Sequence, residues 1–306
     1  MPTDSAAAPT WTADDRIFVQ IPAYRDRELV STVEALYREA RRPERLRVAI
    51  AWQYHPEELP LEHALRRWEG VDLLKIPAAQ SEGCNWARRL LQERWQGERY
   101  TLLLDSHHRF IPGWDEVAVG MLEGLRSAGV TKPILTGYLP PYQPDQDPEG
   151  RSPALLGIRS SGREGGLLFR LVSEPVPEAA RLLSPFPARF TSLHFLLADG
   201  SFNEEVVIDS SIYFFVDEIT MALRAYTRGY DLYHPHRVLG WHLYDRATRT
   251  PHWQDHARWQ TQNQISCQRA RAMYRGRLTG RYGIGSRRTV ADYEALIGEP
   301  LLIEGT

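Results

Sequence analysis

The sequence contains few cysteines and no long hydrophobic run. Cys84 and Cys267 are the two cysteines among 306 residues, a number too small for a disulfide framework and typical of a reducing compartment. The sequence alone does not decide whether these two cysteines form a single long-range disulfide. No run of about eighteen apolar residues occurs, and residues 1–10 have neither the basic nor the apolar region of a secretion signal. We therefore expect a soluble, cytoplasmic protein without a membrane partner.

The sequence also lacks an excess of charge of either sign. It has 37 Lys and Arg against 39 Asp and Glu, a formal net charge of −2. Bulk electrostatics therefore favours neither a nucleic acid nor an anionic membrane as partner. Internal repeats are absent as well, and the chain is long enough to bury one large core. We expect one catalytic-sized domain.

Strands and helices alternate over the first half of the chain. Helical spacing of apolar residues predicts a helix behind an N-cap at Asp26, a second helix after Gly83, and a third from Trp114 to Leu125. Short apolar runs between and around them predict strands at residues 17–21, 46–52, 71–76, 101–104 and 132–137. This alternation is typical of an α/β domain with a mostly parallel sheet.

Residues 140–190 are dominated by Pro, Gly, Ser and Arg. A long segment of this composition predicts a flexible loop or lid over a functional site. A plain linker between domains has the same composition and is the alternative interpretation. Residues 167–172 could form a short edge strand within it. At the other end of the chain, the small and polar residues 1–15 predict a disordered N-terminus.

Regular structure is expected again after this loop. A strand is predicted at residues 192–197, and a helix from Asp217 to Gly229. Residues 230–234 and 238–244 are predicted as a final pair of strands. We expect one domain over residues 16–245, followed by a basic, helical C-terminal extension over residues 246–306.

An acidic residue and two histidines follow the predicted central strand. Ligands bind at the carboxyl ends of strands in open α/β sheets, and Asp105 and His107 project to the same side if the strand continues. They could share one cation, and an oxygen with an imidazole suits Mn²⁺. Alternatively, Asp105 caps a turn and His107 is an ordinary surface histidine. His108 receives no functional role.

Three other charged residues, one before and two after this motif, could serve a charged substrate. Arg88 follows a Gly-containing turn at a predicted helix start, where backbone N–H groups and a guanidinium can meet an anion. Asp217 and Glu218 begin a helix, where the helix dipole favours carboxylates even without any chemistry.

Cys84 is interpreted as a small buried residue.

Six segments in register resemble the GT-A glycosyltransferases, and within them the GlcNAc-transferase family typified by the cytoplasmic Skp1 hydroxyproline GlcNAc-transferase. The resemblance implies a Rossmann-like nucleotide-diphospho-sugar transferase fold and a retaining transferase that uses a UDP-sugar, usually UDP-GlcNAc, with Mn²⁺ or Mg²⁺. The six segments are residues 21–26, 104–115, 132–136, 217–218, 227–235 and 241–244. The chain departs from the family at Ser192–Phe195, where a small-Gly-Phe segment is usual, and at Val216–Glu218, where Gly-Glu-Glu is usual.

The resemblance also implies roles for particular residues. Asp105 and His107 match the family's Asp-X-His metal motif, and His242 matches the distal histidine that supplies a third ligand. Asp217 or Glu218 would orient the acceptor hydroxyl or support an oxocarbenium-like centre, unless the departing phosphate takes the acceptor's proton. The residues implied at the nucleotide are Ala23, Tyr24, Arg25, Gln53, Asp72, Arg88, Asp105 and Ser106.

The predicted function is transfer of GlcNAc from UDP-GlcNAc to a hydroxyl on a peptide, a protein or a small molecule. The same fold with another donor, UDP-GalNAc, UDP-glucose or UDP-galactose, is the nearest alternative. A metal-dependent hydrolase would need a second metal cluster, which the sequence does not suggest. A sugar-binding module without activity would be expected to have a degraded metal motif. The sequence does not indicate an oligomeric state.

Overall fold

The computed structural model describes residues 15–246 and 249–303. Apart from Asp15, the N-terminus predicted to be disordered lies outside these residues. Cys84 and Cys267 are both free. In the two described ranges, no helix combines the length and the apolar character needed to cross a membrane.

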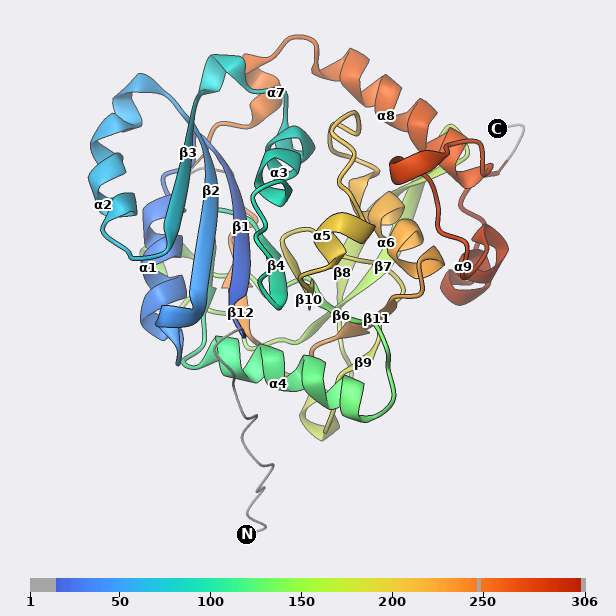
Figure 1. Ribbon diagram of the computed structural model, residues 1–306, viewed down its shortest axis with the longest axis horizontal. Helices are drawn as coiled ribbons and strands as arrows, with labels where there is room; N and C mark the ends of the chain where they lie inside the picture. The colour runs from blue at the N-terminus through green and yellow to red at the C-terminus, as the bar shows by residue number, and fades with distance from the viewer. Residues whose placement is uncertain (1–14, 247–248, 304–306) are drawn as a thin grey trace.

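A mixed sheet of eight strands forms the centre of the molecule (Figure 1). The strand order is β3-β2-β1-β4-β10-β6-β11-β9. β10 runs antiparallel to both of its neighbours and β9 runs antiparallel to β11, whereas the other neighbouring pairs are parallel. The mostly parallel α/β sheet is thereby confirmed. The strands are β1 (Ile17–Tyr24), β2 (Leu46–Tyr54), β3 (Val71–Pro77), β4 (Tyr100–Leu104), β6 (Pro133–Thr136), β9 (Phe186–Pro187), β10 (Phe195–Asp199) and β11 (Asp231–His234).

Helices cover both faces of the sheet because successive side chains of its strands point to opposite faces. In β1, Ile17 and Val19 pack on one apolar cluster, and Phe18 packs on another. The first face is covered by α1 (Leu29–Glu39), α2 (Glu62–Arg66) and α4 (Trp114–Ser127). The opposite face is covered by α3 (Cys84–Gln92), α5 (Phe202–Glu205) and α6 (Asp217–Thr227).

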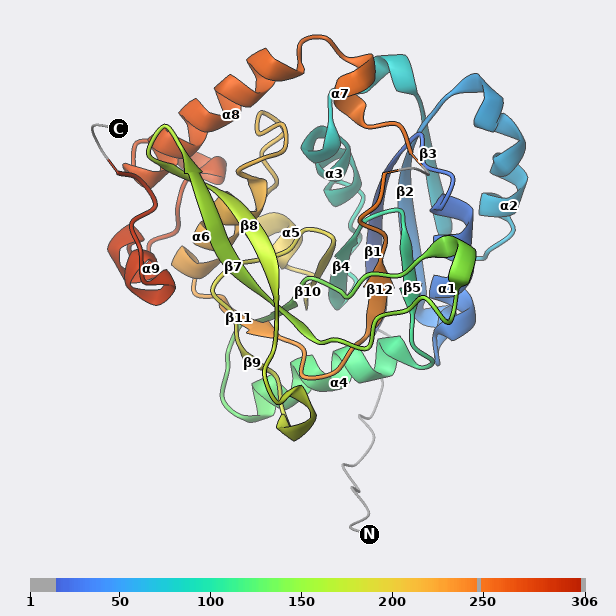
Figure 2. The same ribbon diagram turned by 180° about the vertical axis from the view of Figure 1, so that it is seen from behind.

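A β-hairpin occupies part of the segment that was expected to be an irregular loop. It consists of β7 (Leu156–Glu164) and β8 (Leu167–Pro175), which cross the molecule in Figure 2. The predicted strand at residues 167–172 lies within β8, whereas its partner β7 was not predicted. Gly165 and Gly166 form the turn with φ values of 52° and 75°, which glycine adopts without strain. The pattern was hard to detect because the second half of β7 is polar on both faces and lacks alternation.

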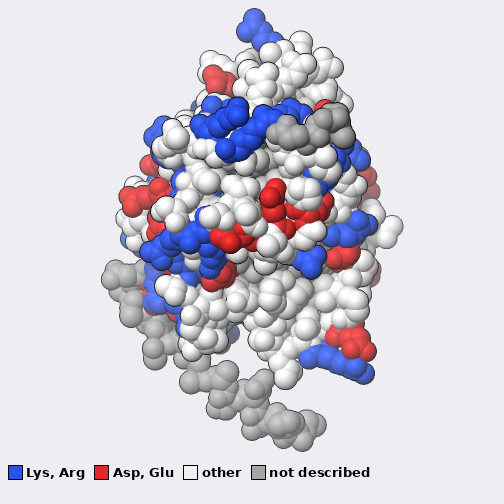
Figure 3. All heavy atoms as spheres, turned by 90° about the vertical axis from the view of Figure 1, so that its right-hand side faces the viewer, with Lys and Arg blue, Asp and Glu red and all other residues white. Residues whose placement is uncertain are grey.

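The C-terminal segment completes the core of the domain. It forms α7 (His252–Asp255), α8 (Trp259–Tyr274) and α9 (Val290–Ile297). Met273 and Tyr293 are fully buried in the same apolar cluster as α6, so residue 245 does not separate two cores. Figure 3 shows the side of the molecule on which α9 lies, where acidic and basic groups are interspersed, as the nearly balanced composition predicts.

A second, small sheet brings a distant strand to the end of β4. β12 (Gly240–His242) pairs antiparallel with β5 (His108–Phe110), and His242 lies opposite His108. The two strands predicted at residues 230–234 and 238–244 are present as β11 and β12, and they belong to different sheets, since β11 lies beside β6 in the central sheet. Gly240 allows the close approach, because a Cβ atom there would lie 2.4 Å from the carbonyl oxygen of Arg109.

Candidate active site

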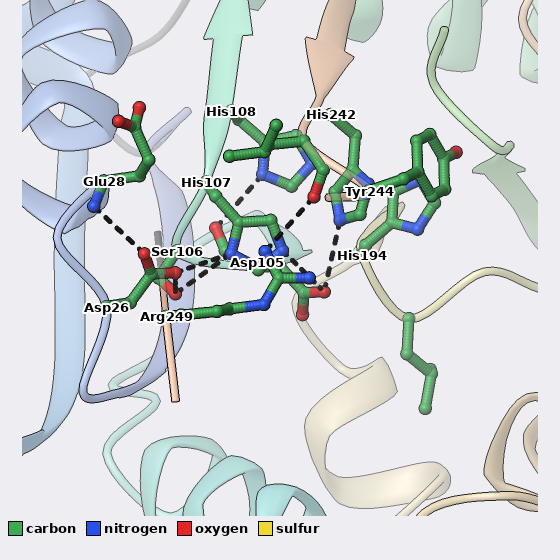
Figure 4. Close-up of polar contacts among 12 residues, drawn as sticks. Asp26, Glu28, Asp105, Ser106, His107, His108, His194, His242, Tyr244 and Arg249 are labelled. Atoms are coloured by element: carbon green, nitrogen blue, oxygen red, sulfur yellow. Dashed lines mark hydrogen bonds and ion pairs between the residues drawn. The ribbon is translucent and has the colours of Figure 1, made fainter. Parts of the chain in front are cut away.

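Asp105, His107 and His242 meet at the carboxyl end of β4 (Figure 4). Asp105 directly follows β4, His107 precedes β5, and His242 ends β12. One ligand atom from each side chain lies within 4.8 Å of the other two. Asp105 Oδ2 lies 3.8 Å from His107 Nε2 and 3.5 Å from His242 Nε2. The structure thus brings together the three residues that the sequence predicted as metal ligands.

The nitrogens of this cluster fit a metal ion. His107 Nε2 and both ring nitrogens of His242 are buried, and none of the described residues forms a hydrogen bond with them. Buried polar atoms are nearly always paired, so unpaired nitrogens beside a carboxylate are compatible with a site for a metal ion. One carboxylate oxygen and two imidazoles are a donor set suited to Mn²⁺ and other borderline divalent ions.

Asp26 orients His107 rather than capping a helix. The predicted N-cap is wrong, because α1 begins at Leu29 and Glu28 is its N-cap. Asp26 Oδ2 lies 2.6 Å from His107 Nδ1 and also accepts the Ser106 hydroxyl at 2.6 Å. Burial would raise the pKa of Asp26, but the contact with His107 outweighs it and lowers the pKa. A carboxylate at Nδ1 keeps the proton on that nitrogen and leaves Nε2 free to face the cluster.

Arg88 joins Asp105 to Asp217. It lies within α3, is 3% exposed, and donates from Nη2 to Asp105 Oδ1 at 3.0 Å and from Nη1 to Asp217 Oδ2 at 3.2 Å. Burial would raise the pKa of Asp105, but His242 and the Arg88 guanidinium hold it well below the ordinary value. Asp105 is therefore ionised, with one oxygen on Arg88 and the other toward the imidazoles.

His242 is a neutral imidazole at physiological pH. Burial lowers its pKa to about 4, because a charged ring is disfavoured away from water. A neutral ring has a lone pair to give to a metal, and it leaves the positive charge of the metal available to a substrate.

The two carboxylates at the start of α6 have different surroundings. Asp217 accepts from Arg88, from Asn85 Nδ2 at 3.2 Å, and from the backbone N–H of Glu218 at 2.8 Å. Glu218 instead accepts the Tyr138 hydroxyl at 2.6 Å and a backbone N–H at 3.0 Å. Burial and the neighbouring Asp217 raise the pKa of Glu218 to about 7. Burial raises the pKa of Asp217 as well, although Arg88 opposes this shift. Glu218 can exchange a proton near neutral pH, and Asp217 is bound to Arg88.

The residues at the end of β1 lie beside the cluster of Asp105, His107 and His242. Tyr24 and Arg25 each donate to Asp255 of α7 at 2.6 Å. The backbone oxygen of Ala23 accepts from Gln53 Nε2 at 3.3 Å. A cavity of about 150 Å³ opens next to them, and its lining includes Tyr24, Asp26, Cys84, Asp105, Ser106, His107, Arg249 and Trp253.

Asp72 is not brought to this site. It lies near the start of β3, opposite Ala49 of β2, whereas the site lies at the carboxyl ends of the strands. Both of its oxygens accept from Arg94, at 2.6 and 2.7 Å. The structure therefore gives Asp72 a partner away from the cavity.

Sequence reasoning missed several rings that surround His242. His194 stacks on it with ring centroids 4.2 Å apart, and Tyr244 and His108 contact it at 4.4 and 4.9 Å. His108 also places Nδ1 3.1 Å from the backbone oxygen of Asp105. The departure at Ser192–Phe195 was the signal that could have drawn attention to His194, since it puts an imidazole where the family usually has a small-Gly-Phe segment.

Solved structures of glycosyltransferases have a similar fold. GalNAc-T7 with UDP, GalNAc and Mn²⁺ matches with a TM-score of 0.62 and 14% identity over 94% of this chain and 59% of its own. S. aureus TarS 1–349 matches with a TM-score of 0.57 and 9% identity over 94% of this chain and 70% of its own. Its complex with UDP-GlcNAc matches with a TM-score of 0.55 and 10% identity over 92% and 70%. These likenesses confirm the predicted GT-A fold, and this chain spans less than two thirds of GalNAc-T7.

Sequence comparison shows the family. No curated protein matches the sequence. The model of the family Glycosyltransferase (GlcNAc) matches residues 16–66 and 58–299, which include Asp105, His107 and His242. Since this match covers nearly all of the described residues, the chain belongs to the Glycosyltransferase (GlcNAc) family.

Proposed function

We propose that this chain is a metal-dependent, retaining glycosyltransferase that moves GlcNAc from UDP-GlcNAc to a hydroxyl on a peptide, a protein or a small molecule. The observation that carries the proposal is the cluster of Asp105, His107 and His242 with its unpaired nitrogens. The family match and the TarS complex with UDP-GlcNAc support this donor. Within the family, we assign the chain to the Skp1-type group because of the six motifs in its sequence.

Asp105, His107 and His242 would hold Mn²⁺ or Mg²⁺. The ion would act as a Lewis acid toward the negative charge that develops on the leaving diphosphate. Asp26 fixes the tautomer of His107 through the 2.6 Å contact at Nδ1. Arg88 neutralises the second oxygen of Asp105, so the carboxylate keeps a defined orientation.

The residues at the end of β1 would bind the nucleoside part of the donor. Ala23, Tyr24 and Arg25 lie at the carboxyl edge of the sheet, where nucleotides bind in α/β folds. Gln53 supports this edge from β2 through its contact with the Ala23 carbonyl. Asp72 is left out of this proposal, since it pairs with Arg94 near the start of β3.

Glu218 is the carboxylate that we assign to the acceptor side. Its pKa of about 7 lets it accept a proton or a hydrogen bond from a hydroxyl at neutral pH. Asp217 would act indirectly, by holding Arg88. A route in which the departing phosphate takes the acceptor's proton also agrees with this arrangement, and Glu218 would then orient the hydroxyl.

A different UDP-sugar is the second candidate donor. The structure of GalNAc-T7, which contains UDP, GalNAc and Mn²⁺, supports UDP-GalNAc in particular. A two-metal hydrolase is disfavoured, because the described part of the chain has one group of three metal-ligating side chains. A sugar-binding module without activity would have no need for buried, unpaired imidazole nitrogens beside a carboxylate.

The test is intact-mass analysis of candidate acceptors after incubation with Mn²⁺ and one of four donors, UDP-GlcNAc, UDP-GalNAc, UDP-glucose or UDP-galactose. We expect a gain of one N-acetylhexosamine with UDP-GlcNAc, and an α-anomeric product by NMR. The Asp105→Asn variant is the control for contaminating activity. A gain of one hexose with UDP-glucose or UDP-galactose alone would reject the proposed donor, and a β-anomeric product would reject retention.

A further inference from the structure

No described residue hydrogen-bonds to the Nδ1 atom of His242, in contrast to the Nδ1 atom of His107. His107 has a carboxylate at the nitrogen that faces away from the cluster, with 2.6 Å between His107 Nδ1 and Asp26 Oδ2. This is the usual device for orienting a metal-ligating histidine. His242 Nε2 lies 3.5 Å from Asp105 Oδ2, but no described residue hydrogen-bonds to Nδ1, although His242 is 5% exposed. Packing against the ring therefore contributes to its orientation.

Several rings pack against His242, and those of His194 and Tyr244 are the nearest among the described residues. His194 lies nearly parallel to it, with centroids 4.2 Å apart and an interplanar angle of 20°. Tyr244 meets it edge-on, with centroids 4.4 Å apart and an angle of 68°. Stacked and T-shaped contacts are the two preferred geometries of aromatic pairs. Figure 4 shows both rings next to His242 on the side away from His107.

One backbone segment holds all three rings. The N–H of Leu139 donates to His194 Nε2 at 3.1 Å, and the carbonyl of the same residue accepts the Tyr244 hydroxyl at 2.8 Å. The next carbonyl, of Pro140, accepts the backbone N–H of His242 at 3.0 Å. The positions of the three rings are therefore fixed relative to one another by residues 139–140.

The same hydrogen bond excludes His194 as a metal ligand. A ring nitrogen that accepts an N–H carries no proton, so the proton of the neutral ring is on Nδ1. The lone pair of Nε2 is used by Leu139, and Nδ1 has none to offer. His194 presents its flat face, not a nitrogen, to His242.

We propose that His194 is a positioning residue, whose ring holds His242 in the orientation that binds the metal. This inference rests on the proposed function, because it requires that Asp105, His107 and His242 bind a divalent cation. His194 orients His242 as Asp26 orients His107, but it does so through the face of its ring and not through a carboxylate.

Two substitutions separate the ring of His194 from its hydrogen bond. His194→Gln keeps an acceptor for the Leu139 N–H but removes the ring, whereas His194→Phe keeps a flat ring but removes the acceptor. The dissociation constant of Mn²⁺ is measured by electron paramagnetic resonance of free Mn²⁺, without donor or acceptor. We expect His194→Gln to weaken binding about 10-fold or more, the range found when groups behind metal ligands are replaced. We expect His194→Phe to stay within about 3-fold of the wild type, with a lower melting temperature.

The matched control is His234→Gln. His234 is also a buried imidazole on a backbone group, with Nδ1 2.8 Å from the Thr136 oxygen, and its ring does not touch His242 in the described structure. Its substitution should leave Mn²⁺ affinity unchanged. His194→Leu, which fills the same space without a flat ring, replaces the glutamine variant if that variant does not fold, and should also bind Mn²⁺ about 10-fold more weakly.

The outcomes separate this inference from the proposed function. If the wild type binds one Mn²⁺ and either His194→Gln or His194→Leu binds it equally well, the positioning role is rejected while the metal site stands. Equal weakening in His194→Phe and His194→Gln would show that the hydrogen bond, not the ring face, matters, and would also reject it. If the wild type binds no Mn²⁺, both proposals fail.

Discussion

Asp26→Asn should weaken metal binding although Asp26 does not belong to the metal cluster. The substitution keeps the shape of the side chain but replaces one oxygen by an NH₂ group. Oδ1 of Asp26 accepts the Glu28 N–H at 3.0 Å, and Oδ2 contacts His107 Nδ1 and the Ser106 hydroxyl at 2.6 Å each. An asparagine that satisfies Glu28 turns its NH₂ toward His107. The imidazole must then give up its Nδ1 proton and carry the proton on Nε2, the nitrogen that faces Asp105.

The expected loss follows from this change of tautomer. A protonated Nε2 has no lone pair for a metal, so each binding event must first restore the original tautomer against the amide. Replacement of such groups typically costs 10- to 100-fold in metal affinity, or about 1.4–2.7 kcal/mol. We expect Asp26→Asn to fall in this range.

The assay is the dissociation constant of Mn²⁺, measured together with thermal unfolding in the absence of metal. Asp115→Asn is the matched control, because Asp115 is also 2% exposed and accepts two backbone N–H groups, from Arg41 and Arg42 at 2.7 and 2.8 Å. Both variants should lose stability, and only Asp26→Asn should lose Mn²⁺ affinity. Wild-type affinity in Asp26→Asn would refute the argument that the carboxylate sets the tautomer of His107.

His242→Ala should lower activity with partial rescue at high Mn²⁺, whereas His236→Ala should be mild; equal losses of UDP release in the two variants would reject the third ligand. Folding raises the pKa of Glu218 to about 7, so its carboxyl binds protons more tightly in the folded state, and the protein should lose stability as pH rises from about 4.5 to 7. Glu218→Gln should flatten this part of the profile in thermal unfolding, and an unchanged slope would contradict the assignment. Asp72→Asn should leave UDP affinity by calorimetry unchanged, and a 10-fold loss would return Asp72 to the nucleotide site. Residues 140–190 should gain hydrogen-exchange protection when UDP and Mn²⁺ bind, and equal protection in both states would favour a segment without a lid function.

The parts of the fold that sequence predicted are those with local patterns. The apolar run that ends at Leu104 is a fully buried strand, β4, because burial on both faces requires continuous apolar residues. The helix at Trp114 was predicted because its apolar residues recur on one face. The pairing of β12 with β5 could not be predicted, because it joins residues more than 100 positions apart and depends on a turn of the chain after β11.

The metal cluster was predictable in part for the same reason. Asp105 and His107 lie two residues apart at a strand end, so their proximity follows from local geometry. His242 was found through the resemblance to a family and not through spacing. The roles proposed for Asp26 and His194 rest on contacts with residues that are distant in the sequence, His107 and His242. Neither a helix N-cap pattern nor a single histidine reveals such a contact.

The most direct test of the proposed function is the rate of UDP release from UDP-GlcNAc before metal removal, after treatment with EDTA, and after Mn²⁺ is added back. The proposal predicts that release stops with EDTA and returns with Mn²⁺ in the wild type, and that Asp105→Asn releases no UDP under any of the three conditions. Undiminished release in EDTA, or wild-type release by Asp105→Asn, would contradict the claim that Asp105, His107 and His242 form the metal site of a glycosyltransferase.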